Sequence, residues 1–134
     1  MLEIDRIVSA DVAAPPERCV AVLADVEGYP RWASLITSAS RAGERVRLEA
    51  SVLGVPFEMD CELVVSPDRV VLRRIPNDAA DEERFETHWT VSPGRVELHV
   101  HAILDAPGPA RLIRSRLERK VADDLLADFL RAVF

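Results

Sequence analysis

Three histidines on two neighbouring segments are the side chains of this sequence best suited to acid–base chemistry. His88 lies in "RFETHWTVS", and His99 and His101 lie in "RVELHVHAIL". If the intervening Pro-Gly forms a tight turn with Ser92 opposite Arg95, His88 pairs with His99 across a hairpin. Such a pair could transfer protons near neutral pH or bind a metal ion. No carboxylate or cysteine in a known ligand geometry accompanies it, so we expect no metal and place the histidines in solvent.

The same register puts large apolar side chains on the other face of the hairpin. It pairs Trp89 with Leu98 and Phe85 with Ala102, while Thr87 is a polar exception among them. Both faces sort cleanly into polar and apolar residues under this one register. The hairpin is therefore expected to bury its Trp89 face.

Arg74 is the charged residue that could share this buried face. It alternates with Val70 and Leu72 in "VVLRRI", and a buried arginine there would need an acidic partner or an anionic ligand. If the strand ends one residue earlier, Arg74 points to water, and we favour this simpler arrangement. Arg74 is a candidate catalytic group only in the first case, and otherwise the sequence names no catalytic residue.

The periodicity of the chain predicts an antiparallel sheet and a long terminal helix. Alternation indicates strands, and apolar residues three or four positions apart indicate helices. The expected strands cover 3–13, 37–42, 45–53, 56–65, 70–75, 84–92 and 95–104, and the main helices cover 16–25 and 109–134. A curved antiparallel sheet buries its inner face against helices, and only the terminal helix is long enough to cross it. Because that helix fills part of the groove, space should remain beside it.

Charged residues on the first strand and the terminal helix lead to two further expectations. Arg6 interrupts the alternation of the first strand, which we ascribe to a frayed end. On the terminal helix, Arg119 with Asp123 and Lys120 with Asp124 should form ion pairs one turn apart on the solvent face.

The run "EGYPRW" marks the corner between the first helix and the sheet. Gly28 and Pro30 should end that helix, "PRWASLI" could form one more turn, and proline disfavours helical geometry at Tyr29. Trp32 then either plugs the junction between sheet and helix or walls one end of a cavity.

Composition limits the classes of protein to consider. The chain has 134 residues, 49% of them apolar and 30% charged, which fits one globular domain over 1–134. A net charge of −6 argues against binding to nucleic acid or anionic membranes. No basic leader or long apolar run is present, so we expect a cytoplasmic protein without stable membrane insertion. Cys19 and Cys61 are expected to be reduced and buried rather than paired.

Three segments carry a resemblance to a known superfamily. They are "AAPPERCVAVLADVEGYPRW", "RFETHWTV" and "APGPARLIRSRLERKVADDLLADFL". Together they resemble the START-like, or SRPBCC, superfamily of helix-grip proteins, which includes polyketide cyclases and dehydratases and coenzyme Q-binding proteins. The resemblance implies an α+β helix-grip fold, with six to seven antiparallel strands wrapped around the terminal helix and two short helices after the first strand.

The resemblance also implies a cavity between the sheet and the terminal helix that takes a hydrophobic small molecule. Combined with the alternation of the strands, it suggests a set of cavity residues: Trp32, Leu48, Phe57, Met59, Cys61, Phe85, Thr87, Trp89, Leu98, Leu117 and Val121. Few acid–base groups point inward, so binding of a polyketide, lipid, isoprenoid quinone or aromatic molecule without a cofactor is the first hypothesis. A polyketide cyclase or dehydratase is the second, and a protein-interaction module like the ribosome-binding members is the third.

Overall fold

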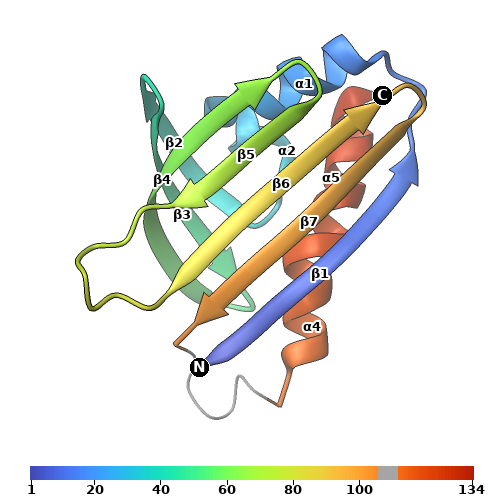
Figure 1. Ribbon diagram of the computed structural model, residues 1–134. Helices are drawn as coiled ribbons and strands as arrows, with labels where there is room; N and C mark the ends of the chain where they lie inside the picture. Colours follow the sequence, from blue (N-terminus) through green and yellow to red (C-terminus); the bar gives the residue numbers. More distant parts are fainter. Residues whose placement is uncertain (106–111) are drawn as a thin grey trace.

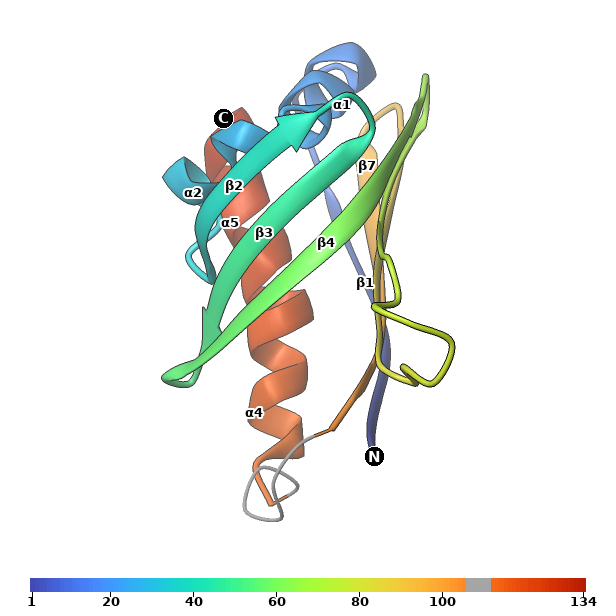
Figure 2. The ribbon, with the colours of Figure 1, turned by 90° about the vertical axis from the view of Figure 1, so that its left-hand side faces the viewer.

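The computed structural model of the chain describes residues 1–105 and 112–134. Seven antiparallel strands form one sheet in the order β1-β7-β6-β5-β4-β3-β2, and it curves around the terminal helix (Figures 1 and 2). The strands are β1 (Leu2–Asp11), β2 (Ile36–Ala42), β3 (Arg45–Val52), β4 (Val55–Ser66), β5 (Arg69–Arg74), β6 (Arg84–Ser92) and β7 (Arg95–Leu104). The helices between β1 and β2 are α1 (Pro16–Ala24), the 3-10 turn η1 (Val26–Gly28) and α2 (Tyr29–Trp32). This architecture confirms the predicted helix-grip fold.

The hairpin of β6 and β7 has the predicted register. Ser92 lies opposite Arg95, Trp89 opposite Leu98 and His88 opposite His99. The turn between the strands needs a positive φ, which Gly94 supplies at 79°. The buried and exposed faces of this hairpin could therefore be assigned from the sequence.

The terminal helix is shorter and less regular than predicted. It comprises α4 (Arg114–Glu118), a π-helical turn η2 (Arg119–Asp123) and α5 (Asp124–Val133). The predicted start at Pro109 lies outside the described residues. Figure 2 shows this helix running along the concave side of the sheet, with β2 to β4 bending around it. Within the described ranges, no helix combines the length and the apolar composition needed to cross a membrane.

Arg6 links the first strand to the terminal helix, which corrects two expectations. Its Nε and Nη2 donate to Oδ1 and Oδ2 of Asp123 at 2.6 and 2.8 Å. Arg6 is thus not a frayed residue, and Asp123 pairs with it rather than with Arg119. A bidentate guanidinium–carboxylate pair is favoured over a flexible pair along one helix because both oxygens are bonded. The other predicted pair, Lys120 with Asp124, is present at 3.1 Å.

The corner after α1 is helical at Tyr29, contrary to prediction. Tyr29 has φ −54° and ψ −40° and opens α2, with Pro30 in the first turn. A proline there costs no hydrogen bond because the first amides of a helix have no acceptor inside it. The Tyr29 hydroxyl also donates to the Leu23 carbonyl at 2.5 Å. This buried bond compensates for the steric preference that Pro30 imposes.

Aromatic contacts join the terminal helix to the sheet and to the corner. The rings of Trp89 on β6 and Phe129 on α5 are 5.0 Å apart between centroids. Trp32 lies 5.8 Å from Phe129 and 5.0 Å from Tyr29, in edge-on geometry. Phe129 is therefore in contact with two elements at once, and it is fully buried.

Replacing Phe129 with alanine should lower the free energy of unfolding by about 3–5 kcal/mol, because a fully buried aromatic ring leaves a cavity. Phe134, which directly follows α5, is 98% exposed and provides the matched control. The Phe134→Ala change should stay within about 0.5 kcal/mol of the parent. Urea unfolding followed by circular dichroism measures both. Equal effects of the two changes would show that Phe129 does not anchor the helix.

Candidate functional site

A cavity of about 150 Å³ lies between the concave face of the sheet and the first half of the terminal helix. Its lining is apolar except for Asp105 at the end of β7. The lining consists of Leu2, Ile4, Leu35, Ile36, Leu48, Ala50, Val52, Leu53, Val55, Phe57, Met59, Phe85, Leu104, Asp105, Ile113, Leu117 and Val121. Because polar partners are so scarce, the walls favour apolar contents over water.

The periodicity of the strands and the helix explains why these side chains converge. Leu48, Ala50 and Val52 alternate along β3, so all three face the concave side. Leu117 and Val121 lie one turn apart on the terminal helix and face the sheet. The two patterns meet across the groove and form its opposite walls.

The cavity reaches the surface near the turn between β3 and β4. Val55 at this turn is 47% exposed, and Leu53, Phe57 and Met59 are half-buried. Val55 and Asp105 are the exposed residues of the described lining, so we place the mouth of the pocket beside them. A small molecule could enter here without passing through the packed core.

Leu53 at this mouth has a backbone conformation that is rare for its type. Its φ is 50°, and the following Gly54 has φ 81°. Such a two-residue turn favours asparagine or glycine, and a leucine there costs about 1 kcal/mol or more. Among the described residues, Leu53 is the only one other than glycine with positive φ. Its side chain forms part of the cavity wall.

Of the residues proposed from the sequence, just over half lie in this lining. Those in the lining are Leu48, Phe57, Met59, Phe85, Leu117 and Val121. Those outside it are Trp32, Cys61, Thr87, Trp89 and Leu98. Trp32 is half-buried against Phe129, and the other four are buried in the core. Alternation identifies the inner face of the sheet, but it does not say which part of that face the helix covers.

The sequence analysis missed lining residues at the edge of the sheet and in the turns. Ile4 could have been found, because the alternation of the first strand already placed it on the buried side. Leu53 and Val55 could not, because Leu53 alternates to the outer side of the predicted strand 45–53 and Val55 precedes the predicted strand 56–65. Leu35 and Ile36 follow α2, and their position depends on how the corner folds.

Arg74 does not point to water as expected, nor does it line the cavity. It is the last residue of β5, and its side chain is 10% exposed. Its Nη2 donates to Oδ2 of Asp81 at 2.7 Å, and its Nη1 donates to the carbonyl of Glu83 at 2.9 Å. Asp81 also accepts the backbone amides of Asn77 and Glu83. These bonds, chiefly that from Arg74, lower the pKa of Asp81 to about 2.

Cys61 is held in its thiol form. It lies on β4, opposite Arg74 of β5, and is fully buried. Burial, with a smaller contribution from the charge of Asp60, raises the pKa of Cys61 to about 12. A thiol is a poor nucleophile, so Cys61 suits packing rather than covalent chemistry. Cys19 is buried and free as well.

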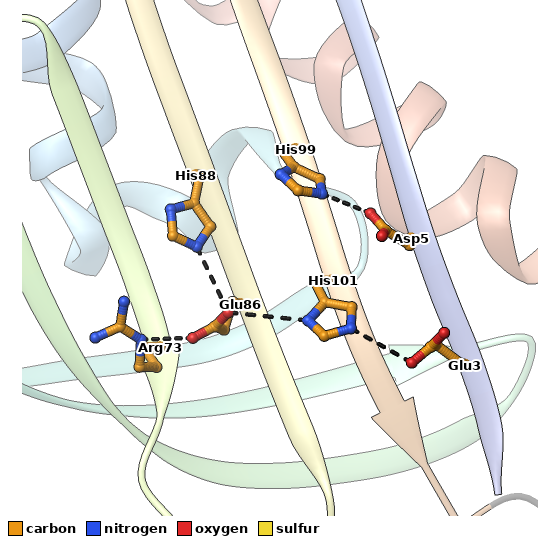
Figure 3. Close-up of polar contacts among 7 residues, drawn as sticks. All are labelled: Glu3, Asp5, Arg73, Glu86, His88, His99 and His101. Atoms are coloured by element: carbon orange, nitrogen blue, oxygen red, sulfur yellow. Dashed lines mark hydrogen bonds and ion pairs between the residues drawn. The ribbon is translucent and has the colours of Figure 1, made fainter.

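The three histidines lie on the convex face with acidic partners, as Figure 3 shows. His99 Nε2 is 2.6 Å from Oδ1 of Asp5, and this hydrogen bond lowers the pKa of the Asp5 carboxyl. His88 and His101 lie within 3.6 and 4.0 Å of Glu86. The described residues contain no group of three or more possible metal ligands. Because they lie on the convex face, the three histidines point away from the cavity.

Polar contacts also hold the loop that leads to the cavity. Asp128, buried on α5, accepts the backbone amide of Ser34 at 2.9 Å and its hydroxyl at 2.8 Å. Leu35 and Ile36 follow Ser34 directly and belong to the lining. This part of the wall is therefore fixed to the well-packed half of the terminal helix.

Solved structures with the same fold cover nearly all of the chain. A protein from Thermus thermophilus is 22% identical, with a TM-score of 0.74, covering 98% of this chain and 97% of that one. The Zhui aromatase/cyclase from a Streptomyces species is 20% identical, with a TM-score of 0.72 and coverages of 98% and 94%. A START superfamily protein from Mycobacterium smegmatis is 17% identical, with a TM-score of 0.66 and coverages of 98% and 96%.

These identities show a shared fold, and no curated protein matches the sequence. The model of one protein family, described as polyketide cyclase / dehydrase and lipid transport, matches residues 12–132. That range includes both helices of the corner, six of the seven strands and nearly all of the terminal helix. The chain belongs to this polyketide cyclase / dehydrase and lipid transport family.

Proposed function

We propose that this protein binds a hydrophobic or aromatic small molecule in the cavity and does not alter it. The observation that supports this most directly is the lining, in which every described residue except Asp105 is apolar. Transfer of apolar surface from water into such a cavity stabilises a complex by about 25 cal/mol per Å². Polyketides, lipids, isoprenoid quinones and aromatic metabolites are the broad ligand classes to consider.

The strained turn at the mouth supports the same proposal. The turns at Gly43 and Gly94 place glycine where φ is positive, whereas the turn between β3 and β4 also uses Leu53. A residue chosen for the turn alone would be small or polar. Leu53 instead extends the apolar wall of the cavity. A strained leucine at this position is explained if the cavity holds a ligand.

A polyketide cyclase or dehydratase is the alternative, and the names of the family and of the Zhui aromatase/cyclase favour it. Such an enzyme would need groups that donate and remove protons at the bound chain. Among the described residues, Arg74 is engaged by Asp81 and the histidines lie on the convex face. The geometry therefore supports binding better than acid–base catalysis by these residues.

Hydrophobic ligands should raise the melting temperature of the protein. A ligand that binds only the folded state adds about 2.7 kcal/mol to stability at one hundred times its dissociation constant. A panel of aromatic, isoprenoid and acyl compounds, read by differential scanning fluorimetry, measures this shift.

An Ala50→Phe variant provides the matched control for that panel. Ala50 lies in the cavity wall, so the added ring should fill the space and abolish the shifts without removing any contact. If no compound stabilises the parent, or if the filled variant responds equally, binding in this cavity is disproved.

Trp32 should act as a support for the helix junction rather than as a wall of the cavity. Its ring contacts Tyr29 and Phe129, and it is absent from the lining. A Trp32→Ala change should lower the free energy of unfolding by about 2 kcal/mol while ligand affinity stays within about two-fold. Chemical denaturation and ligand titration at a temperature where the variant is folded separate the two effects. Near-normal stability with lost binding would assign Trp32 to the cavity.

The Arg74–Asp81 pair should stabilise the protein in a pH-dependent way. The pKa of Asp81 is about 2 in the folded protein and ordinarily 3.8, so folding favours the charged form. Its contribution is complete above pH 4 and is lost as the pH falls towards 2. Asp81→Asn should therefore lower the melting temperature at pH 7, and its difference from the parent should shrink between pH 4 and pH 2. A difference that is constant over this range would contradict the assignment.

A further inference from the structure

We infer that the cavity selects a compact, uncharged ligand whose buried part is no larger than one ring or a chain of about six to eight carbons. This inference rests on the proposed binding function and narrows its ligand class. Four features support it: the volume of the cavity, the wall that closes its inner end, the fixed position of that wall, and the lack of charge partners other than Asp105 among the described lining residues.

The volume sets the size of the buried group. A dry apolar cavity of about 150 Å³ in another protein holds a single benzene ring, and the cavity here has the same volume. A linear chain of six to eight carbons needs similar space if its end emerges at the mouth. A folded polyketide of several rings or a quinone tail would exceed this space.

The inner end of the groove is filled by side chains. The rings of Trp89 and Phe129 pack there in tilted geometry with centroids 5.0 Å apart, and Leu98, opposite Trp89 on β7, has no exposed surface. A longer ligand would have to displace these rings, and displacing a packed aromatic pair costs several kcal/mol. The ligand can therefore extend only towards the mouth at Leu53 and Val55.

This inner wall is also held by polar bonds in the middle and at the C-terminal end of α5. Asp128 accepts two hydrogen bonds from Ser34, and the Nε of Arg18 donates to the carbonyl of Val133 at 3.0 Å. A movement of α5 that lengthened the cavity would break these bonds. The size limit is thus a property of the packed half of the molecule.

The described lining offers no partner for a buried charge. Apart from Asp105, no described lining residue carries a side chain that could bind an ion or donate a hydrogen bond. Burying a carboxylate or ammonium group without partners is strongly unfavourable. Asp105 adds repulsion against an anionic end at the mouth, whereas an uncharged hydroxyl group there stays hydrated.

A homologous series of alcohols tests the size limit. The protein contains two methionines, Met59 in the cavity wall and Met1 at the exposed N-terminus. With ¹³C-methyl methionine, the Met59 signal reports on cavity occupancy and the Met1 signal is the internal control. Titration with 1-butanol through 1-decanol should tighten binding about four-fold per methylene up to about six to eight carbons and then level off.

Octanol and octanoate form the matched pair for charge. Octanoate should bind at least ten-fold more weakly, because Asp105 in the wall repels its carboxylate and the other described lining residues offer it no polar partner. Equal affinity would overturn the preference for uncharged ligands. Continued tightening through decanol would overturn the size limit while leaving the proposed function intact. If no alcohol shifts the Met59 signal, the proposed binding function itself fails.

Two variants test whether the cavity wall sets the limit on ligand size. Phe85 is a half-buried wall residue, so Phe85→Ala should enlarge the cavity and move the plateau to longer alcohols by two or three carbons. Ile7 on the convex face is 60% exposed, and Ile7→Ala should leave the whole series unchanged. If Phe85→Ala leaves the plateau in place, the cavity wall does not set the size limit.

Discussion

The contact between Trp89 and Phe129 holds the terminal helix against the concave face of the sheet. Trp89 comes from a central strand and Phe129 from α5, so the contact between their rings joins the two layers of the fold directly. Trp32 packs on the other side of Phe129 and brings the corner after α1 into the same cluster. The close packing of these rings fills the space between the helix and the sheet at this point. The position of the helix, and with it the shape of the cavity, depends on this cluster.

The terminal helix therefore has two halves with different surroundings. The second half, α5, carries Phe129 and Asp128 and is held by aromatic packing and by Ser34. The first half, α4 and the π-helical turn, faces the cavity with smaller aliphatic side chains, Leu117 and Val121. A π-helical turn changes the direction of the side chains that follow it, and such turns occur often at functional sites. Here the turn separates the packed half from the half that faces the cavity.

Ion pairs lie around the core rather than inside the cavity. Arg6 and Asp123 connect the edge strand to the helix, and Arg74 and Asp81 organise the loop before β6. Each guanidinium finds a carboxylate within hydrogen-bonding distance, which satisfies the partly buried charge. Apart from Asp105, the described walls of the cavity are aliphatic, aromatic or thioether. This separation of charge from the site is the basis of our proposal that the protein binds a ligand without altering it.

The sequence by itself determined the architecture, the faces of the strands and the family. Strict alternation and a glycine turn were enough to predict that Trp89 pairs with Leu98 and that the histidines face outward. These are local regularities, because the side-chain direction along a strand repeats every two residues. The same reasoning placed Leu48, Phe57, Met59, Phe85, Leu117 and Val121 on facing surfaces, and the cavity lies between them.

Only the tertiary structure decided which part of the inner face is filled and which is hollow. Alternation predicts that Trp89 and Met59 both face inward. In the structure, Trp89 packs against Phe129, whereas Met59 lines the cavity. The partners of Arg6 and Arg74 were likewise beyond prediction, since Asp123 is far away in the chain and Asp81 lies in a loop without periodicity. Periodicity determines the face on which a side chain lies. Contacts between distant segments determine what it meets there, because they depend on how the helix crosses the curved sheet.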